Sequence, residues 1–169
     1  MLLTEFTSRV TAVVPAAAPR VFAALTDVDA LPEWNACISS VVEPPAAAMA
    51  PGVVWVVGIK IPAPPASWHS RATCTTYDAD GLVFAHRSVT DDGNPSHVAW
   101  TWRVTPLTPT TAQVDVTWSV NPRTFWRRLL LARIRRPQLE HEVARSLSEL
   151  SSLLGAPGRA GGAPVHHAE

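Results

Sequence analysis

The sequence is poor in charge and almost devoid of lysine. Only 17% of its 169 residues are charged, Lys60 is the only lysine, and the formal net charge is zero. Because nucleic-acid-binding proteins usually present a basic surface, this balance does not indicate a nucleic-acid partner. The only cysteines, Cys37 and Cys74, form no CxxC pair and are too few for a disulfide framework.

Long hydrophobic runs and cofactor motifs are missing as well. The longest apolar run, 53–61, contains Lys60 and is far too short to span a bilayer. The opening residues MLLTEFTSR lack the basic start and apolar stretch of a secretion signal, so we expect a cytoplasmic protein. The sequence contains no HExxH, no paired His/Cys spacing, no phosphate-binding glycine loop and no GxSxG. We therefore expect no metal and no other cofactor.

Apolar residues are plentiful, at 47% of a chain that has the length of one ordinary domain. Alternation of apolar and polar residues predicts strands that are half buried and half exposed to solvent. It is clearest in two segments, where Val98, Trp100, Trp102 and Val104 share one face and Val114, Val116, Trp118 and Val120 share another. The expected strands are 6–14, 37–43, 53–61, 68–77, 82–89, 98–104 and 114–120.

Three helices are expected. Pro19 is placed to begin the first, and residues 27–34 indicate a short second one. Asn121-Pro122 resembles an N-cap followed by the first residue of a long helix, which Pro137 would kink or divide in two. One stripe of this helix is apolar: Leu139, Val143, Leu147, Leu150 and Leu154.

The order of elements predicts an α+β fold in which an antiparallel meander is covered by the last helix. We expect one domain over residues 1–154. Residues 155–169 are rich in glycine, proline and alanine, and we expect a disordered tail there.

Three segments resemble the START-like (SRPBCC) superfamily, which includes polyketide cyclase/dehydrase and lipid-transport proteins. Segment 21–42 is similar to the family's first helix and the tryptophan after it, 97–120 to its last two strands, and 144–154 to its closing helix. The matching residues of the first segment are Val21, Phe22, Leu25, Asp27 and Trp34. The resemblance implies a helix-grip fold, with about seven curved strands around a long C-terminal helix and two short helices after the first strand. It also implies hydrophobic ligands, and no catalytic motif is shared across the family.

The candidate ligand-binding residues are mostly aromatic. Trp100, Trp102 and Trp118 lie on apolar strand faces, where they would either fill the core or form a cavity wall that stacks on a flat ligand. Trp55 and Phe84 complete this candidate wall. The resemblance gives Trp34 a structural role.

The candidate catalytic residues are His86, Tyr77 and Arg71. His86 shares a face with Phe84 and would be either a general base or a core histidine without a role in chemistry. Tyr77 and Arg71 lie on one face of 68–77, and the sequence does not say which face of that strand turns inward.

The last helix adds a basic candidate. In a straight helix Arg136 would point into the apolar interior and would need an acidic ligand group, whereas a change of phase at Pro137 would leave it facing solvent. It belongs to a basic cluster that is either a solvated face or a contact for an acidic carrier domain or an anionic membrane. The cluster comprises Arg123, Arg127, Arg128, Arg133, Arg135 and Arg136.

Three functions fit this sequence. The first is binding of a small hydrophobic molecule such as a polyketide, a lipid or a sterol-like compound. The second is a cyclase, aromatase or dehydratase acting on such a ligand by holding it in one reactive shape. The third is a protein-interaction module on the same fold.

Overall fold

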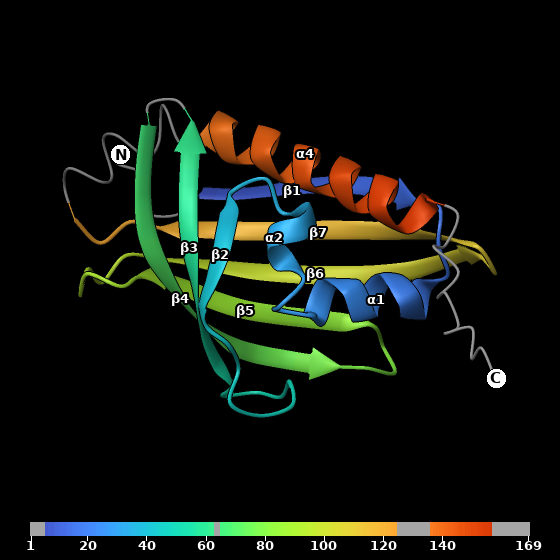
Figure 1. Ribbon diagram of the computed structural model, residues 1–169, viewed down its shortest axis with the longest axis horizontal. Helices are drawn as coiled ribbons and strands as arrows, with labels where there is room; N and C mark the ends of the chain where they lie inside the picture. Colours follow the sequence, from blue (N-terminus) through green and yellow to red (C-terminus); the bar gives the residue numbers. More distant parts are fainter. Residues whose placement is uncertain (1–5, 63–64, 125–135, 157–169) are drawn as a thin grey trace, which may run out of the picture.

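The computed structural model describes residues 6–62, 65–124 and 136–156. It has the predicted order of one strand, two short helices, six strands and a long helix (Figure 1). The elements are β1 (Phe6–Val14), α1 (Ala18–Thr26), α2 (Leu31–Trp34), β2 (Ile38–Glu43), β3 (Val54–Pro62), β4 (Pro65–Asp78), β5 (Val83–Thr90), β6 (His97–Thr108), β7 (Thr111–Asn121) and α4 (Arg136–Gly155).

One antiparallel sheet contains all seven strands, in the order β1-β7-β6-β5-β4-β3-β2. Strands β2 to β7 form a meander, and β1 joins its far edge beside β7. The sheet is strongly bent, so that β2 and β3 run across the direction of β6 and β7 (Figure 1). With α4 lying along the concave side, this is the helix-grip arrangement that the sequence predicted.

Alternation along β6 and β7 separates an apolar inner face from a polar outer face. Trp102 and Val104 on β6, and Val114, Val116 and Trp118 on β7, are all buried. The residues between them carry polar side chains on the outside of the sheet. The predicted two-sided pattern of these strands is therefore confirmed.

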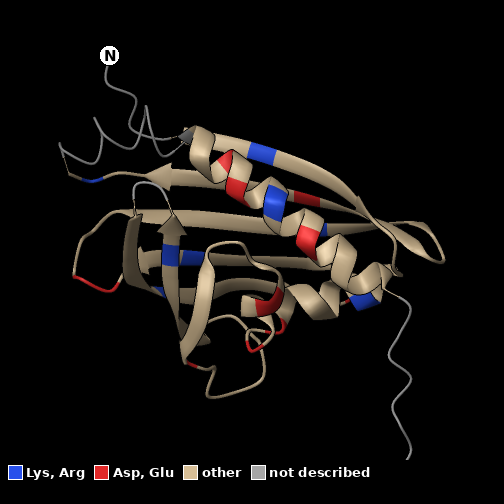
Figure 2. Cartoon of the chain, turned by 45° about the horizontal axis from the view of Figure 1, so that its top comes forward, with Lys and Arg blue, Asp and Glu red and all other residues tan. Residues whose placement is uncertain are grey.

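The long helix covers the inner face with the predicted stripe. Its five leucine and valine residues are at most 8% exposed: Leu139, Val143, Leu147, Leu150 and Leu154. A hydrogen bond of 2.8 Å from Ser8 Oγ to Glu140 joins edge strand β1 to the helix. Acidic and basic residues are dispersed along the visible side of α4 rather than gathered in one patch (Figure 2).

The predicted start of the long helix is wrong. Asn121 is the last residue of β7 and pairs with His97 of β6, so it does not cap a helix, and Pro122 is not helical. Pro137 lies in the first turn of α4, where a missing backbone N–H removes no helical hydrogen bond. The expected kink is therefore absent from the described helix. Residues 125–135 and the tail 157–169 lie outside the described residues.

None of the helices among residues 6–62, 65–124 and 136–156 combines the length and the apolar character needed to cross a bilayer.

A polar network on the outer face joins β1 to β7. Asp115 accepts hydrogen bonds from Thr11 Oγ1 at 2.6 Å and Gln113 Nε2 at 2.9 Å, and it forms an ion pair with Arg9. These hydrogen bonds, the one from Thr11 above all, lower the pKa of the Asp115 carboxyl from 3.8 to about 2. The network therefore stabilises the charged carboxylate on the folded edge of the sheet.

Truncation of the helix stripe tests how much the fold depends on it. We expect Leu150→Ala to lower the free energy of unfolding by about 2–5 kcal/mol, because it leaves a cavity at a fully buried site. Leu153 follows Leu150 by three residues on the same helix but is 41% exposed, so it provides the matched control. Leu153→Ala should change stability by only about 0.5 kcal/mol in urea unfolding. Equal losses in the two variants would contradict this role of the stripe.

The outer network predicts a pH dependence of stability. Between 3.8 and about 2 the unfolded chain binds a proton at Asp115 that the folded chain does not. The free energy of unfolding should therefore fall as the pH is lowered through this window, and the contribution of Asp115 should be fully present above it. Urea unfolding of Asp115→Asn should show less stability at neutral pH and a smaller loss on acidification. An unchanged acid slope would show that Asp115 does not carry the effect.

Candidate active site

A cavity of about 250 Å³ lies between the concave face of the sheet and α4. Leu25 and Leu31 close it from α1 and α2, while Leu139 and Val143 close it from α4. Side chains from β2 through β7 form the rest of the wall. The cavity exists because the bent sheet and the single helix do not meet over their whole length.

Stacked aromatic rings form one side of this cavity. On adjacent strands, Phe84 lies directly across from Trp102 and His86 directly across from Trp100. The ring centroids of His86 and Trp100 are 6.1 Å apart, and those of Trp100 and Trp102 are 6.3 Å apart, both stacked. Trp55 of β3 extends the wall and lies 6.1 Å from Phe84. The strand ladder thus gathers these rings into one aromatic wall.

A further aromatic residue, Trp34, reaches the cavity from α2. Its ring meets Trp102 edge to face, with the centroids 6.1 Å apart. The indole Nε1 atoms of both residues are buried without a hydrogen-bond partner among the described residues. Each indole therefore keeps an N–H donor that no described residue uses.

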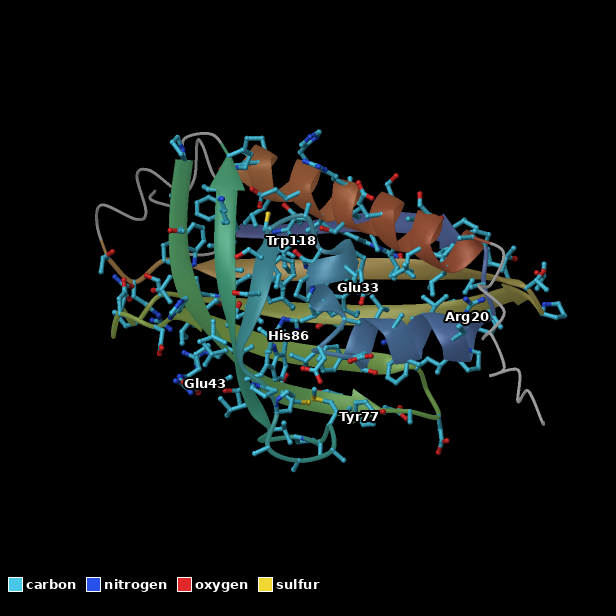
Figure 3. The ribbon with its side chains drawn as sticks, in the orientation of Figure 1. Arg20, Glu33, Glu43, Tyr77, His86 and Trp118 are labelled. Atoms are coloured by element: carbon cyan, nitrogen blue, oxygen red, sulfur yellow. The ribbon has the colours of Figure 1, made fainter. Side chains whose placement is uncertain are left out.

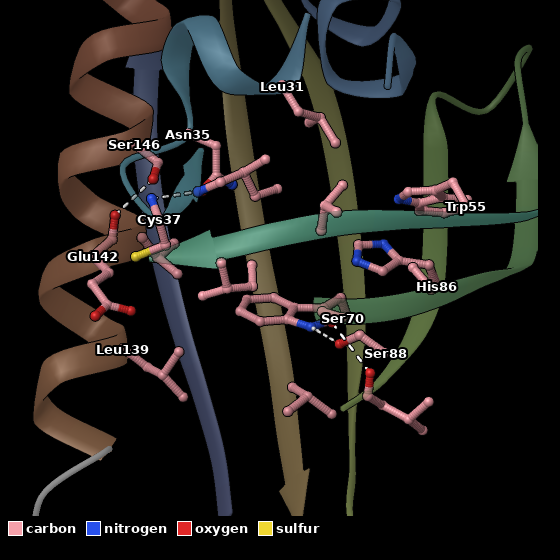
Figure 4. Close-up of a pocket in the computed structure, with 18 of the residues that line it drawn as sticks. Leu31, Asn35, Cys37, Trp55, Ser70, His86, Ser88, Leu139, Glu142 and Ser146 are labelled. Carbon is pink, nitrogen blue, oxygen red and sulfur yellow. Dashed lines mark hydrogen bonds between the residues drawn. The ribbon is translucent and has the colours of Figure 1, made fainter. Parts of the chain in front are cut away.

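Most polar side chains around the cavity already bond within the protein (Figure 4). Ser146 Oγ accepts from the Ala36 N–H at 2.9 Å and donates to the backbone carbonyl of Glu142 at 2.8 Å. Asn35 Oδ1 accepts two backbone N–H groups just before β2. Ser88 Oγ accepts the indole N–H of Trp100 at 3.0 Å. These groups position the elements around the cavity.

His86, like the indoles of Trp34 and Trp102, is an exception. It lines the cavity from β5, is half buried, and its Nδ1 is fully buried without a hydrogen-bond partner among the described residues. Burial among aromatic rings lowers the pKa of His86 from 6.5 to about 3, because the charged form loses its hydration. The imidazole is therefore neutral at physiological pH and is a weak base.

Four of the predicted ligand-binding residues line the cavity: Trp55, Phe84, Trp100 and Trp102. Trp118 does not. It is 1% exposed and stacks behind Trp100, with the centroids 5.5 Å apart, so it supports the wall from the core. Trp34, which the sequence placed in a structural role, lines the cavity instead.

The three predicted catalytic residues do not come together. Arg71 lies on the outer face of β4, where it pairs with Asp91 at 3.1 Å and Glu43 at 3.4 Å. The inner face of this strand presents Trp68, Ser70 and Ala72 to the cavity. This answers the question of orientation that the sequence left open.

An irregularity in β4 turns Tyr77 to the inner side of the sheet, but the residue does not line the cavity. A bulge between Cys74 and Thr76 shifts the alternation of β4, so Tyr77 turns to the inner side although Arg71 does not. Its ring lies 5.6 Å from Phe22 of α1 and does not line the cavity (Figure 3). Of the three candidates, only His86 is a cavity residue.

Most of the basic candidates lie outside the described residues. The side chain of Arg136 and residues 127, 128, 133 and 135 lie outside the described residues. Arg123 is exposed just after β7, and its backbone N–H donates to Ser96 Oγ at 2.9 Å. The predicted anion-binding role of this cluster stays a prediction.

Sequence reasoning missed the contribution of the segment between α2 and β2. Trp34, Asn35 and Cys37 all line the cavity, and Ser146 of α4 holds this segment through Ala36. The only signal was the tryptophan at the end of a short helix. Nothing in the local sequence showed that the bend of the sheet would bring it over Trp102.

Comparison with known proteins yields one family and several structures. The profile of the family described as "Polyketide cyclase / dehydrase and lipid transport" matches residues 5–155. No curated protein sequence matches the chain significantly.

Among solved structures, the Zhui aromatase/cyclase from Streptomyces sp. R1128 is 19% identical, covers 94% of this chain and 98% of its own, and gives a TM-score of 0.70. Ara h 8.0201 is 12% identical, with coverages of 90% and 99% and a TM-score of 0.68. A norcoclaurine synthase point mutant from Thalictrum, in complex with a transition-state analogue, is 11% identical, with coverages of 89% and 94% and a TM-score of 0.63. At these identities the likenesses establish the fold alone.

The environment of His86 predicts that its ring does not titrate at physiological pH. Histidine-ring NMR signals assigned to His86 should stay constant between about pH 5 and 8, where an ordinary histidine changes charge. Because the unfolded chain takes up this proton near pH 6.5 and the folded chain only near 3, stability should fall as the pH drops through that range. His86→Phe should reduce the fall. A midpoint near 6.5 for His86 in the folded protein would contradict the buried, neutral assignment.

Proposed function

We propose that this chain, which belongs to the polyketide cyclase/dehydrase and lipid transport family, binds a small planar hydrophobic molecule in the cavity between its sheet and α4. The family match confirms the START-like resemblance drawn from the sequence. Membership supports hydrophobic ligand binding on this fold, and the cyclase alternative is compatible with it.

One observation carries the proposal: the wall of the cavity is a row of stacked rings. Trp55, Phe84, Trp100 and Trp102 present an aromatic surface, and the aliphatic residues of α4 lie on the other side. Each square ångström of apolar ligand surface that such a site removes from water contributes about 25 cal/mol. A planar aromatic compound gains this burial and stacking contacts together.

The size of the cavity limits the ligand. An apolar cavity of about 150 Å³ accommodates benzene, so about 250 Å³ corresponds to roughly two fused rings. A larger polyketide or sterol would need the surrounding elements to move apart. We therefore place the preferred ligand in the class of one- and two-ring aromatic compounds.

A cyclase or aromatase activity is the alternative, and one observation favours it: a histidine ring stands in the cavity wall. An efficient general base, however, has a conjugate-acid pKa near the working pH, and that of His86 is lowered to about 3. Arg71 and Tyr77, the other candidates, lie away from the cavity. Ligand binding is therefore the function that the cavity supports better, and catalysis is the alternative. An assay with a poly-β-ketone substrate would separate the two, because binding alone predicts no turnover.

Three further assignments belong to this proposal. We propose a cytoplasmic location, which a chain with only two cysteines suits. We propose that residues 1–154 act as one ligand-binding domain. Contact of the Arg123–Arg136 cluster with an acidic carrier or a membrane surface stays a proposal that rests on the sequence alone.

Naphthalene is the simplest probe of this function. We expect it to bind, to raise the melting temperature with increasing concentration, and to change the tryptophan fluorescence of the protein. Val57→Trp should weaken its affinity by about tenfold or more, equivalent to about 1.4 kcal/mol, because Val57 lines the cavity and a tryptophan there fills it.

The matched control is Val54→Trp on the same strand. Val54 is 37% exposed and does not line the cavity, so this variant should keep wild-type affinity. If Val57→Trp disturbs folding, Ala72→Leu fills the same cavity with a smaller side chain. Equal naphthalene affinity in wild type and in a folded filled-cavity variant would show that the ligand binds elsewhere. A lack of binding by the wild type would refute the proposed function.

A further inference from the structure

Three rings that line the cavity carry a nitrogen without a hydrogen-bond partner among the described residues, those of Trp34, Trp102 and His86. Of these, only the imidazole can accept a hydrogen bond, because an indole N–H only donates. Serine and asparagine side chains around the cavity already hydrogen-bond to backbone or indole groups. His86 forms no such bond with any described residue, although its ring lines the cavity. A ligand in the cavity can supply a hydrogen-bond partner to the nitrogen of this ring that faces it.

The surroundings of the ring fix which nitrogen is free to meet a ligand. Nδ1 is fully buried, whereas the ring as a whole is only half buried and lies open to the cavity (Figure 4). Its remaining exposure therefore belongs to the other side of the ring, which carries Nε2. The ligand meets Nε2, and Nδ1 stays inside the protein.

The same surroundings select the tautomer. A neutral imidazole carries its proton on one nitrogen and a lone pair on the other. The Trp55 ring lies 5.5 Å from the His86 ring, centroid to centroid, with the planes tilted by 56°. An N–H group at Nδ1 can make a weak contact with the electron-rich face of an aromatic ring, whereas a lone pair there cannot. The proton accordingly belongs on Nδ1, which leaves Nε2 as an acceptor.

We propose that the cavity selects a hydroxylated aromatic ligand, a phenol or an enol, whose hydroxyl group donates a hydrogen bond to Nε2 of His86 while Nδ1–H is held among the aromatic rings. This selectivity rests on the proposed binding function and names its ligand class. An ether or a ketone at the same place brings no donor. A protonated amine brings a donor with a charge, and burial of that charge in an apolar wall is much more costly.

Two matched ligands test the selectivity. The affinities of 2-naphthol and 2-methoxynaphthalene are measured by calorimetry for the wild type and for His86→Phe, which keeps an aromatic ring but has no acceptor. The ratio of the affinity for 2-naphthol to the affinity for the ether should be about 2- to 10-fold larger in the wild type than in His86→Phe. This difference is equivalent to one neutral hydrogen bond. Comparison of the two ratios cancels the difference in hydrophobicity between the ligands.

His69→Phe is the matched control, since His69 is an exposed histidine whose β4 neighbours Trp68 and Ser70 are the ones that line the cavity. It should give the wild-type ratio. Equal ratios in wild type and His86→Phe would overturn the proposal, yet tight binding of both ligands would leave the proposed function standing. Failure of both ligands and of naphthalene to bind would refute the proposed function.

A second measurement does not depend on binding. Nitrogen-15 NMR of the histidine-labelled wild-type protein, without ligand, identifies which ring nitrogen of His86 carries the proton. We expect a protonated Nδ1 and an unprotonated Nε2. The opposite tautomer would overturn the proposal even if phenols bind, because Nε2 would then be a donor. This measurement also decides the question if the His86→Phe variant does not fold.

Discussion

The apolar inner face of the bent sheet has to be covered, and α4 is the long element that covers it. Its leucine stripe packs against the core, and the hydrogen bond from Ser8 to Glu140 ties it to the edge strand β1. One straight helix cannot follow the whole curvature of seven strands. The part of the sheet that it does not reach is where the cavity lies, so the same constraint that stabilises the fold also creates the binding site.

The shape of the cavity wall follows from the strand register. Directly paired residues place Phe84 beside Trp102 and His86 beside Trp100, and Trp118 stacks behind this row. A stack supported from behind holds its rings in fixed positions, because close-packed interiors leave little room for other rotamers. The cavity therefore presents a preformed aromatic wall, which reduces the entropy lost when a ligand becomes ordered on it.

How much of this the sequence could predict depends on how local the determining interaction is. The inward faces of β6 and β7 were predictable, because alternation is a property of each strand alone. The position of Tyr77 was not, since a bulge between Cys74 and Thr76 shifts the alternation partway along β4. The start of the long helix was also wrong: Asn121-Pro122 has a good capping pattern, but pairing of Asn121 with His97 keeps it in the sheet. For Trp118 the sequence left core and cavity wall both open, and it gave no sign that Trp34 would line the cavity, because the bend of the sheet and the docking of α2 decide which ring reaches it.

Affinity and basicity oppose each other in this cavity. An apolar, water-poor wall makes burial of an aromatic ligand favourable, and the same wall makes a charge on His86 unfavourable, which lowers the pKa of its ring to about 3. A neutral hydroxyl group resolves this opposition, because it satisfies the imidazole without creating a charge. Proton abstraction would need a second change, a compensating negative charge close to the ring at the moment of reaction. An anionic transition state in the bound substrate could provide that charge, so a catalytic role for His86 would have to be carried by the chemistry of the ligand rather than by the resting protein.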